Sequence, residues 1–245
     1  MTTCSAGSGA PPSDRDTPRL PRPAPARHLH PDHRHPLEPP RPRLPRQRRP
    51  CFALYRRLRA RPDSHLVGTQ KTLPADEVAE ALQRVIDALA RRHANTSDLV
   101  LLGIANGGVA VCQRVAAGLA RALGRDVPHG VVNVAFHRDD LGRNPIPRVA
   151  HPTEIPVDLD DATVVLVDDV IFSGRTVRAA MEEVFANGRP AAIELAVLVD
   201  RGNRRLPIAP DCAGIVLETT PEQKVEVRLD NENPSRDTIT ISQPA

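Results

Sequence analysis

The sequence has 245 residues, a formal net charge of +3 and an uneven distribution of charge. Residues 1–65 contain 14 prolines and 14 arginines against 5 acidic residues, whereas residues 66–245 contain 19 Lys and Arg against 25 Asp and Glu. The basic balance belongs to the first segment, so it is no argument that the remainder binds nucleic acid. The sequence has neither a run of 18 apolar residues nor a signal-peptide core, so we expect a soluble cytoplasmic protein without a membrane partner.

The four cysteines are scattered along the chain, at Cys4, Cys51, Cys112 and Cys212. They form no C-x-x-C pair and show no Cys/His spacing typical of a zinc site. Two of them lie in the proline-rich first segment, which disfavours a disulfide framework. Neither a disulfide scaffold nor a zinc enzyme is therefore expected.

Residues 1–65 are predicted to be a disordered tail rich in Pro, Arg and His, because frequent prolines remove the amide donors that helices and sheets require. One interpretation is a nucleic-acid-binding arm, and another is a weak metal-binding tract at His28, His30, His33 and His35. We favour a linker, or an upstream stretch translated from a start codon set too early, because only two aromatic side chains accompany the charge. Residues 66–245 are assigned to one folded domain.

Hydrophobic periodicity predicts an α/β fold for this domain. Residues 75–92 place apolar side chains at spacings of three and four, as in an amphipathic helix, and residues 99–104 are apolar throughout, as in a buried strand. The other predicted elements are helices over residues 107–123 and 176–187, strands over residues 131–135, 163–167, 192–199, 214–217 and 224–229, and a long loop or hairpin over residues 138–155. This alternation predicts a mostly parallel central sheet with helices on both faces. Ligands of such sheets bind at the carboxyl ends of the strands.

The segment VVLVDDVIFSGRT, residues 164–176, combines the features of a sugar-phosphate site. A buried strand delivers Asp168 and Asp169 to its end, and the alternation of the backbone points the two carboxylates to opposite sides. Gly174 lets the next loop turn closely around an anion, and the helix that follows supplies unpaired amides. Amides and hydroxyls suit a phosphate, and carboxylates suit ribose hydroxyls. The alternative, an ordinary strand–loop–helix with a charged loop, is disfavoured because two buried carboxylates are costly to desolvate.

This segment resembles the phosphoribosyl-pyrophosphate signature of type I phosphoribosyltransferases. Within that superfamily, residues 67–230 resemble the bifunctional pyrimidine-operon regulator and uracil phosphoribosyltransferase family, the PyrR family. The further matching segments are FHRDDL at 136–141, TVRAAM at 176–181, NGRP at 187–190, LVDRG at 198–202 and LPI at 206–208. The resemblance implies the type I phosphoribosyltransferase fold, in which a small hood and a flexible loop accompany the central sheet.

The resemblance also implies roles for individual residues. Asp168 and Asp169 would act as catalytic residues that hold the ribose 2- and 3-hydroxyls. The 5-phosphate would be wrapped by the loop residues Val170, Ile171, Phe172, Ser173, Gly174, Arg175 and Thr176. Arg138 corresponds to a catalytic arginine of the mobile loop that meets pyrophosphate, and the alternative is a surface salt bridge with a neighbouring aspartate.

Two further positions would lie on the base side of the site. Arg201 would approach the substrate there, and the alternative is a structural ion pair with Asp200. Val225 would line the base pocket from the last predicted strand, although an apolar strand residue can equally belong to the core.

One segment departs from the family pattern. After the first predicted strand, well-studied members carry Thr-Arg-Gly, whereas this sequence has Asn106, Gly107 and Gly108. A glycine pair can still present amides to pyrophosphate, and Asn106 can hydrogen-bond to it. The charge of the arginine is absent, so weaker pyrophosphate binding is expected. The alternative for Gly107 is a tight turn without any contact to substrate.

The implied reaction converts uracil and phosphoribosyl pyrophosphate into UMP and pyrophosphate. Because the transition state resembles an oxocarbenium ion, the protein mainly orients the reactants and neutralises the leaving pyrophosphate. Mg²⁺ is the implied cofactor, held chiefly by substrate oxygens, with Asp200 as a candidate outer ligand. A purine or orotate in place of uracil is the alternative substrate.

The second role that the resemblance implies is UMP-dependent binding of a pyrimidine mRNA leader. The net acidic charge of residues 66–245 weakens this expectation. On the first helix, the studied RNA-binding members offer Thr, Arg and His, whereas this chain offers Gln83, Arg84 and Asp87. A regulator with little catalysis is the alternative function. A homodimer or a higher homo-oligomer is expected.

Overall fold

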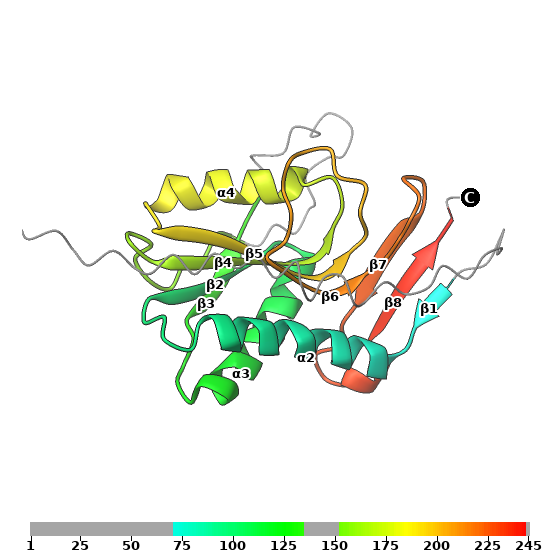
Figure 1. Ribbon diagram of the computed structural model, residues 1–245, viewed down its shortest axis with the longest axis horizontal. Coiled ribbons are helices and arrows are strands. Elements are labelled where there is room, and N and C mark those ends of the chain that lie inside the picture. The colour runs from blue at the N-terminus through cyan, green and yellow to red at the C-terminus, as the bar shows by residue number, and fades with distance from the viewer. Residues whose placement is uncertain (1–70, 135–151, 244–245) are drawn as a thin grey trace, which may run out of the picture. The chain divides into compact units, whose positions relative to one another are not determined.

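The computed structural model describes residues 71–134 and 152–243 (Figure 1). The predicted tail, and the predicted mobile-loop residue Arg138 with the FHRDDL segment, lie outside the described residues. No helix in the described part of the chain is long and apolar enough to cross a membrane.

Five parallel strands form the central sheet, in the order β3-β2-β4-β5-β6. These strands are β2 (Leu99–Ile104), β3 (His129–Val132), β4 (Thr163–Ile171), β5 (Ala192–Asp200) and β6 (Cys212–Val216). One face is covered by α4 (Arg175–Asn187), and the other by α2 (Ala75–Arg92) and α3 (Gly107–Leu123) (Figure 1). The predicted parallel sheet with helices on both faces is confirmed.

The core consists of two clusters, one on each face of the sheet. The apolar run of β4 supplies both, because successive side chains of a strand point to opposite faces. Val164 and Leu166 pack in the cluster that includes α4, whereas Val165 and Val167 pack in the cluster that includes α2 and α3. All four side chains are fully buried. Because both faces of β4 are buried along this run, its sequence is apolar without interruption.

Helix α2 follows from its sequence pattern. Its buried side chains recur at helical spacing on the face toward the sheet, at Val78, Ala81, Leu82, Val85, Ile86 and Leu89. Two acidic residues lie in its first turn and two arginines in its last turn, which matches the direction of the helix dipole.

A second, antiparallel sheet of three strands was only partly predicted. It has the order β1-β8-β7 and consists of β1 (Lys71–Leu73), β7 (Lys224–Arg228) and β8 (Thr238–Ser242). A short 3₁₀ helix, η1 (Pro234–Arg236), precedes β8. The predicted strand 224–229 belongs to this sheet, while β1 and β8 had not been predicted. We call these three strands the hood.

The chain reverses its direction across the central sheet between β2 and β4. After β2 it passes through α3 to β3 at one edge, whereas after β4 it passes through α4 to β5 on the other side. Right-handed crossovers in opposite directions place α3 and α4 on opposite faces of the sheet. The carboxyl ends of β2 and β4 are therefore a topological switch point, which is where α/β sheets bind ligands.

Several boundaries differ from prediction. Strand β4 continues to Ile171 instead of ending at Val167, so the paired aspartates lie inside the strand. Strand β3 occupies residues 129–132 instead of 131–135, and β6 occupies residues 212–216 instead of 214–217. In the predicted long loop, Glu154 forms an antiparallel bridge with Val131, so its end returns to the sheet edge.

Candidate active site

The two aspartates of β4 are held by the backbone that follows them. The amide of Asp169 donates to Oδ1 of Asp168 at 3.0 Å, and the amide of Val170 donates to Oδ1 of Asp169 at 2.8 Å. Asp168 is 6% exposed, while Asp169 is half-buried. Each carboxylate is thus fixed near the carboxyl end of the strand.

Burial raises the pKa of Asp168 well above its ordinary value, and the nearby charge of Asp169 raises this pKa further. The expectation that backbone alternation points the two carboxylates to opposite sides stays a prediction, although Asp169 is near enough for its charge to affect the pKa of Asp168. Two adjacent carboxylates in a buried setting are unfavourable without donors opposite them. A ligand with several hydroxyls, or a cation, would relieve this repulsion.

The loop after β2 meets these aspartates directly. A methyl group at Gly107 would fall 2.3 Å from Oδ2 of Asp169, and one at Gly108 would fall 2.3 Å from the carbonyl oxygen of Val167. Neither glycine has a positive φ, and a turn at residues 105–106 precedes Gly107, so both its role in pyrophosphate binding and the tight-turn alternative stay predictions. Both glycines are required because the start of α3 touches β4. Exposed Asn106 occupies the N-cap position of that helix.

The loop after β4 turns sharply into α4. Gly174 adopts a φ of 88° at the N-cap of α4, a left-handed conformation that favours glycine. Ser173 Oγ accepts a hydrogen bond of 3.3 Å from the amide of Arg175. Both Arg175 and Thr176 are exposed in the first turn of α4. Amides at such a helix start carry a partial positive charge.

Arg201 lies beside this loop and is 6% exposed. Its guanidinium lies 4.2 Å from the ring centroid of Phe172. Nε donates to Thr219 Oγ1 at 3.2 Å, and Nη2 donates to the carbonyl oxygen of Thr220 at 2.9 Å. Burial lowers the pKa of Arg201. The side chain is therefore held against the predicted phosphate loop by a cation–π contact and two hydrogen bonds.

Asp200 forms a salt bridge with Arg204, with Nη2 and Oδ1 2.6 Å apart. The same carboxylate oxygen accepts a 2.9 Å hydrogen bond from the amide of Gly202. Among the described residues, no group of three or more His, Cys, Asp or Glu side chains is placed to hold a metal ion. The role of Asp200 as an outer metal ligand stays a prediction.

Val225 lies on β7, opposite Ile241 of β8. It is half-buried and packs against the core cluster under the hood, together with Val170 of β4. Strands β4 and β7 are in contact, so the hood lies beside the strand that carries the paired acids. A role for Val225 in base binding stays a prediction.

Arg204 and Thr219 contact candidate site residues, and sequence reasoning missed both. Arg204 donates five hydrogen bonds, and Thr219 Oγ1 both accepts from Arg201 Nε and donates to the Arg201 carbonyl oxygen. The only signal in the sequence was that the segment 201–205 contains three arginines, of which Arg204 is the second. Nothing local distinguishes half-buried Arg204 from its exposed neighbour Arg205.

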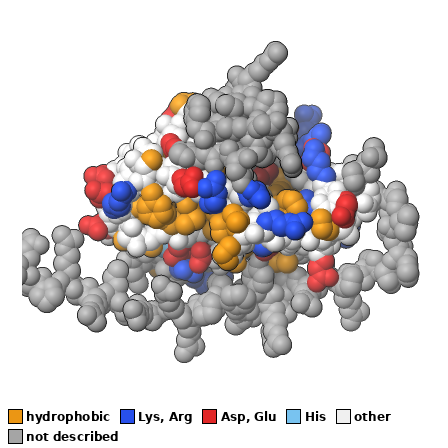
Figure 2. Space-filling model, turned by 90° about the horizontal axis from the view of Figure 1, so that it is seen from above, with side chains coloured by type: hydrophobic (Ala, Val, Ile, Leu, Met, Phe, Trp, Pro, Cys, Tyr) orange, Lys and Arg blue, Asp and Glu red, His pale blue; other side chains and the backbone are white. Residues whose placement is uncertain are grey.

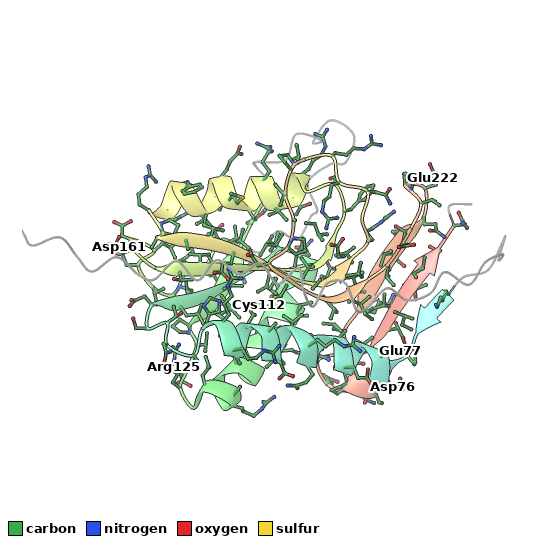
Figure 3. All side chains as sticks on the ribbon, viewed as in Figure 1. Asp76, Glu77, Cys112, Arg125, Asp161 and Glu222 are labelled. Atoms are coloured by element: carbon green, nitrogen blue, oxygen red, sulfur yellow. The ribbon has the colours of Figure 1, made fainter. Side chains whose placement is uncertain are left out.

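Cys112 is not a candidate nucleophile. Its Cβ on α3 lies 2.9 Å from where a methyl group of Gly103 on β2 would be, inside the domain (Figure 3). Burial raises the pKa of the Cys112 thiol to about 12. A thiol that stays protonated at neutral pH cannot attack a substrate.

Comparison with known proteins agrees with this geometry. Residues 74–232 match the family of phosphoribosyl transferase domains. A relative from Chloroflexus aurantiacus is 46% identical over 165 residues, which cover 66% of this chain and 90% of the relative. A relative from Streptomyces coelicolor is 44% identical over 170 residues, which cover 69% and 87%. Both are named bifunctional protein PyrR. The chain belongs to the PyrR family of phosphoribosyltransferases.

Solved structures of other phosphoribosyltransferases share the fold of this PyrR family member. The hypoxanthine phosphoribosyl transferase of Trypanosoma cruzi superposes with a TM-score of 0.53 at 18% identity, over 73% of this chain and 94% of that one. A hypoxanthine-guanine phosphoribosyltransferase of Bacillus anthracis superposes with a TM-score of 0.50 at 18% identity, over 72% and 100%. The type I phosphoribosyltransferase fold with a hood is thereby confirmed.

Proposed function

We propose that the protein is a uracil phosphoribosyltransferase, which converts uracil and phosphoribosyl pyrophosphate into UMP and pyrophosphate. The observation that supports this proposal is the meeting of three parts at the switch point of the sheet. These parts are the aspartate pair of β4, the turn at Gly174 and the glycine pair at the start of α3.

In this proposal each part takes one portion of the substrate. The turn from Phe172 to Thr176 receives the 5-phosphate, since its glycine and the start of α4 present amides. Asp168 and Asp169 accept hydrogen bonds from the ribose 2- and 3-hydroxyls, which relieves the repulsion between the carboxylates. The pyrophosphate lies at Asn106, Gly107 and Gly108. Arg138 would add its charge there, and Arg201 and Val225 would face the base.

The bond that breaks joins the ribose to pyrophosphate, and the bond that forms joins the ribose to a ring nitrogen of the base. Positive charge develops on the sugar as pyrophosphate leaves. Binding at one site orients the reactants, and the carboxylates near the ribose stabilise the developing cation. No nucleophile from the protein is required.

Mg²⁺ fits this site as a partner of the substrate. Without a cluster of three carboxylates or imidazoles among the described residues, the protein offers no complete cage for a cation. Mg²⁺ retains waters and binds through few carboxylates plus substrate phosphates. Asp200 would be an outer ligand of this ion. Bound Mg²⁺ would neutralise the charge of the pyrophosphate.

Turnover of a panel of bases with phosphoribosyl pyrophosphate and Mg²⁺ tests the proposal. Uracil is expected to give the highest kcat/KM among uracil, hypoxanthine, guanine and orotate. Faster turnover of a purine or of orotate would assign the enzyme to a different base. Activity with none of the bases, combined with binding of a pyrimidine mRNA leader, would favour a regulator without catalysis.

We also propose a second function, because the relatives are named bifunctional. This function is UMP-dependent binding of a pyrimidine mRNA leader. Helix α2 supports it weakly. The guanidinium of Arg84 already forms hydrogen bonds within the protein: Nη2 donates to Glu80 at 2.8 Å, and Nη1 donates to the carbonyl oxygen of Gly214 at 3.1 Å. Gln83 donates to Asp87 on the same helix. Leader binding with and without UMP, measured at two salt concentrations, tests this function.

A homodimer or a higher homo-oligomer is also part of the proposal. Hydrophobic side chains gather on the face seen from the α4 side, among acidic and basic groups (Figure 2). Within the described residues, Phe185 of α4 is a large hydrophobic side chain with 46% exposure. Such a patch is typical of a surface that another chain covers. Light scattering of the purified protein measures the oligomeric state.

A further inference from the structure

The segment 201–208 donates hydrogen bonds to the backbone carbonyl groups of the predicted phosphate loop. The amide of Arg201 donates to the carbonyl oxygen of Ile171 at 3.3 Å. The amides of Arg205 and Leu206 both donate to the carbonyl oxygen of Ser173, at 3.0 and 3.1 Å. The remaining carbonyl of this stretch, that of Phe172, is held by a side chain.

That side chain is Arg204, which is 21% exposed. Nη1 donates to the carbonyl oxygens of Ile171, Phe172 and Gly202, at 3.4, 3.0 and 3.0 Å. Nε donates to the carbonyl oxygen of Ile208 at 3.1 Å, and Nη2 donates to Asp200. One guanidinium thereby joins the end of β4, the end of β5 and the far end of the 201–208 segment. Its planar fork of donors suits this task, which a lysine ammonium cannot reproduce.

The direction of these carbonyls determines where the amides of the loop point. In a trans peptide, the carbonyl oxygen and the next amide hydrogen point in opposite directions. The one cis peptide in the described part of the chain is Ala105–Asn106, so the peptides after Ile171, Phe172 and Ser173 are trans. With three successive carbonyls turned toward the 201–208 segment, the amides of Phe172, Ser173 and Gly174 turn away from it. Three amides directed to one side form a concave site for an anion.

We propose that Arg204 is a positioning residue, which orients the amides of the phosphate loop by holding the carbonyl oxygens of Ile171 and Phe172. It touches no substrate in this role. The same guanidinium holds Asp200, and the Arg201 side chain stacks on Phe172, so the segment on the base side and the phosphate loop form one unit. The inference rests on the proposed function only in that the loop binds the 5-phosphate.

Titration with two small probes tests the proposal without any base. Ribose 5-phosphate reports on the phosphate loop, and inorganic pyrophosphate reports on the separate loop at residues 106–108. Arg204→Met removes all five donors at similar length. We expect this variant to bind ribose 5-phosphate about 10- to 100-fold more weakly, because an interaction with a charged group is lost. Its affinity for pyrophosphate should stay within about twofold of the wild type.

Arg205→Met is the matched control, because Arg205 is adjacent and exposed, and its amide contact survives the substitution. It should leave both affinities unchanged. Arg204→Lys keeps the charge opposite Asp200 and guards against a misfolded methionine variant, and we expect an intermediate loss for ribose 5-phosphate. Circular dichroism establishes that each variant is folded.

Two results would overturn the proposal. Equal losses for both probes would mean that Arg204 only supports the fold, and unchanged affinity for ribose 5-phosphate would mean that the loop is held without it. The proposed function fails separately. If wild-type protein binds ribose 5-phosphate but does not convert uracil, the assignment of the base is wrong, and the comparison of Arg204 variants still decides the role of this residue.

Discussion

The carboxylate of Asp169 on β4 lies against the α-carbon of Gly107 at the start of α3, with no room for a methyl group between them. This contact joins the loop proposed for pyrophosphate to the acids proposed for ribose. It also places the carboxylate near the amino end of a helix, where negative charge is stabilised. The loop proposed for pyrophosphate and the acids proposed for ribose can therefore lie this close only because Gly107 has no side chain.

Gly107→Ala should disrupt the site without unfolding the protein. The new methyl group would fall 2.3 Å from Asp169 Oδ2, so the carboxylate must move. A displacement of about 1 Å can lower a rate about 100-fold, and we expect a loss of that order in kcat/KM. Gly124→Ala at the other end of α3 is the control: it strains a residue with φ 65° in open space. That variant should lose about 1 kcal/mol of stability and keep its kinetics.

Asp169→Asn should keep the fold and lose substrate affinity, because it removes the charge at nearly constant size. A hydrogen bond to a charged group contributes about 1.5–3 kcal/mol, which corresponds to roughly a 10- to 150-fold loss in kcat/KM. Steady-state kinetics and a melting curve measure both effects. Lower stability with intact kinetics would mean that Asp169 is a structural cap. The losses from Asp168→Asn and Asp169→Asn should not add, since one sugar contacts both residues.

Asp168→Asn should raise the melting temperature at neutral and alkaline pH. The pKa of Asp168 is raised in the folded protein, so wild-type stability falls as pH rises from the ordinary value of 3.8 through the raised value. The asparagine has no proton to lose and can keep the contact with the amide of Asp169. Each kcal/mol gained shifts the melting temperature by about 2–4 °C. The advantage should vanish near pH 4, and a difference independent of pH would contradict this prediction.

Asp237→Asn should weaken the attachment of the hood. Asp237 is 2% exposed, and both of its oxygens accept from the guanidinium of Arg114 on α3, which also binds the carbonyl oxygen of Asp230. Breaking a buried ion pair from one side lowers stability by about 3–5 kcal/mol. Urea unfolding measures the loss. Glu222 is an exposed acid (Figure 3), so Glu222→Gln provides the comparison. Its effect on the free energy of unfolding should stay below about 0.5 kcal/mol.

A protein that begins at Ser64 should fold and keep its activity. We propose this boundary because residues 1–65 have a composition that cannot offset the entropy of ordering. Values of kcat/KM should agree with the full-length chain within about twofold, and the melting temperatures should coincide. Insoluble protein, or a loss of turnover, would show that the first segment belongs to the domain.

Prediction from sequence succeeded where the pattern is local. The apolar run of β4 and the periodicity of α2 are set by residues a few positions apart, so both elements were found. The hood was only partly found, because the short strand β1 is stabilised by pairing with β8, as between Thr72 and Thr240, which are 168 residues apart. A three-residue strand carries no periodicity of its own.

The sequence by itself determined the alternation of strands and helices in the central sheet, the family resemblance and the segment proposed to bind the phosphoribosyl group. These features depend on hydrophobic period and on neighbouring residues such as Asp168, Asp169 and Gly174. Only the tertiary structure decided that Gly107 touches Asp169, and that Arg204, 32 residues beyond Phe172, holds the carbonyl of that residue. Contacts of this kind depend on how distant segments approach one another in three dimensions, and a single sequence contains no local signal for that approach.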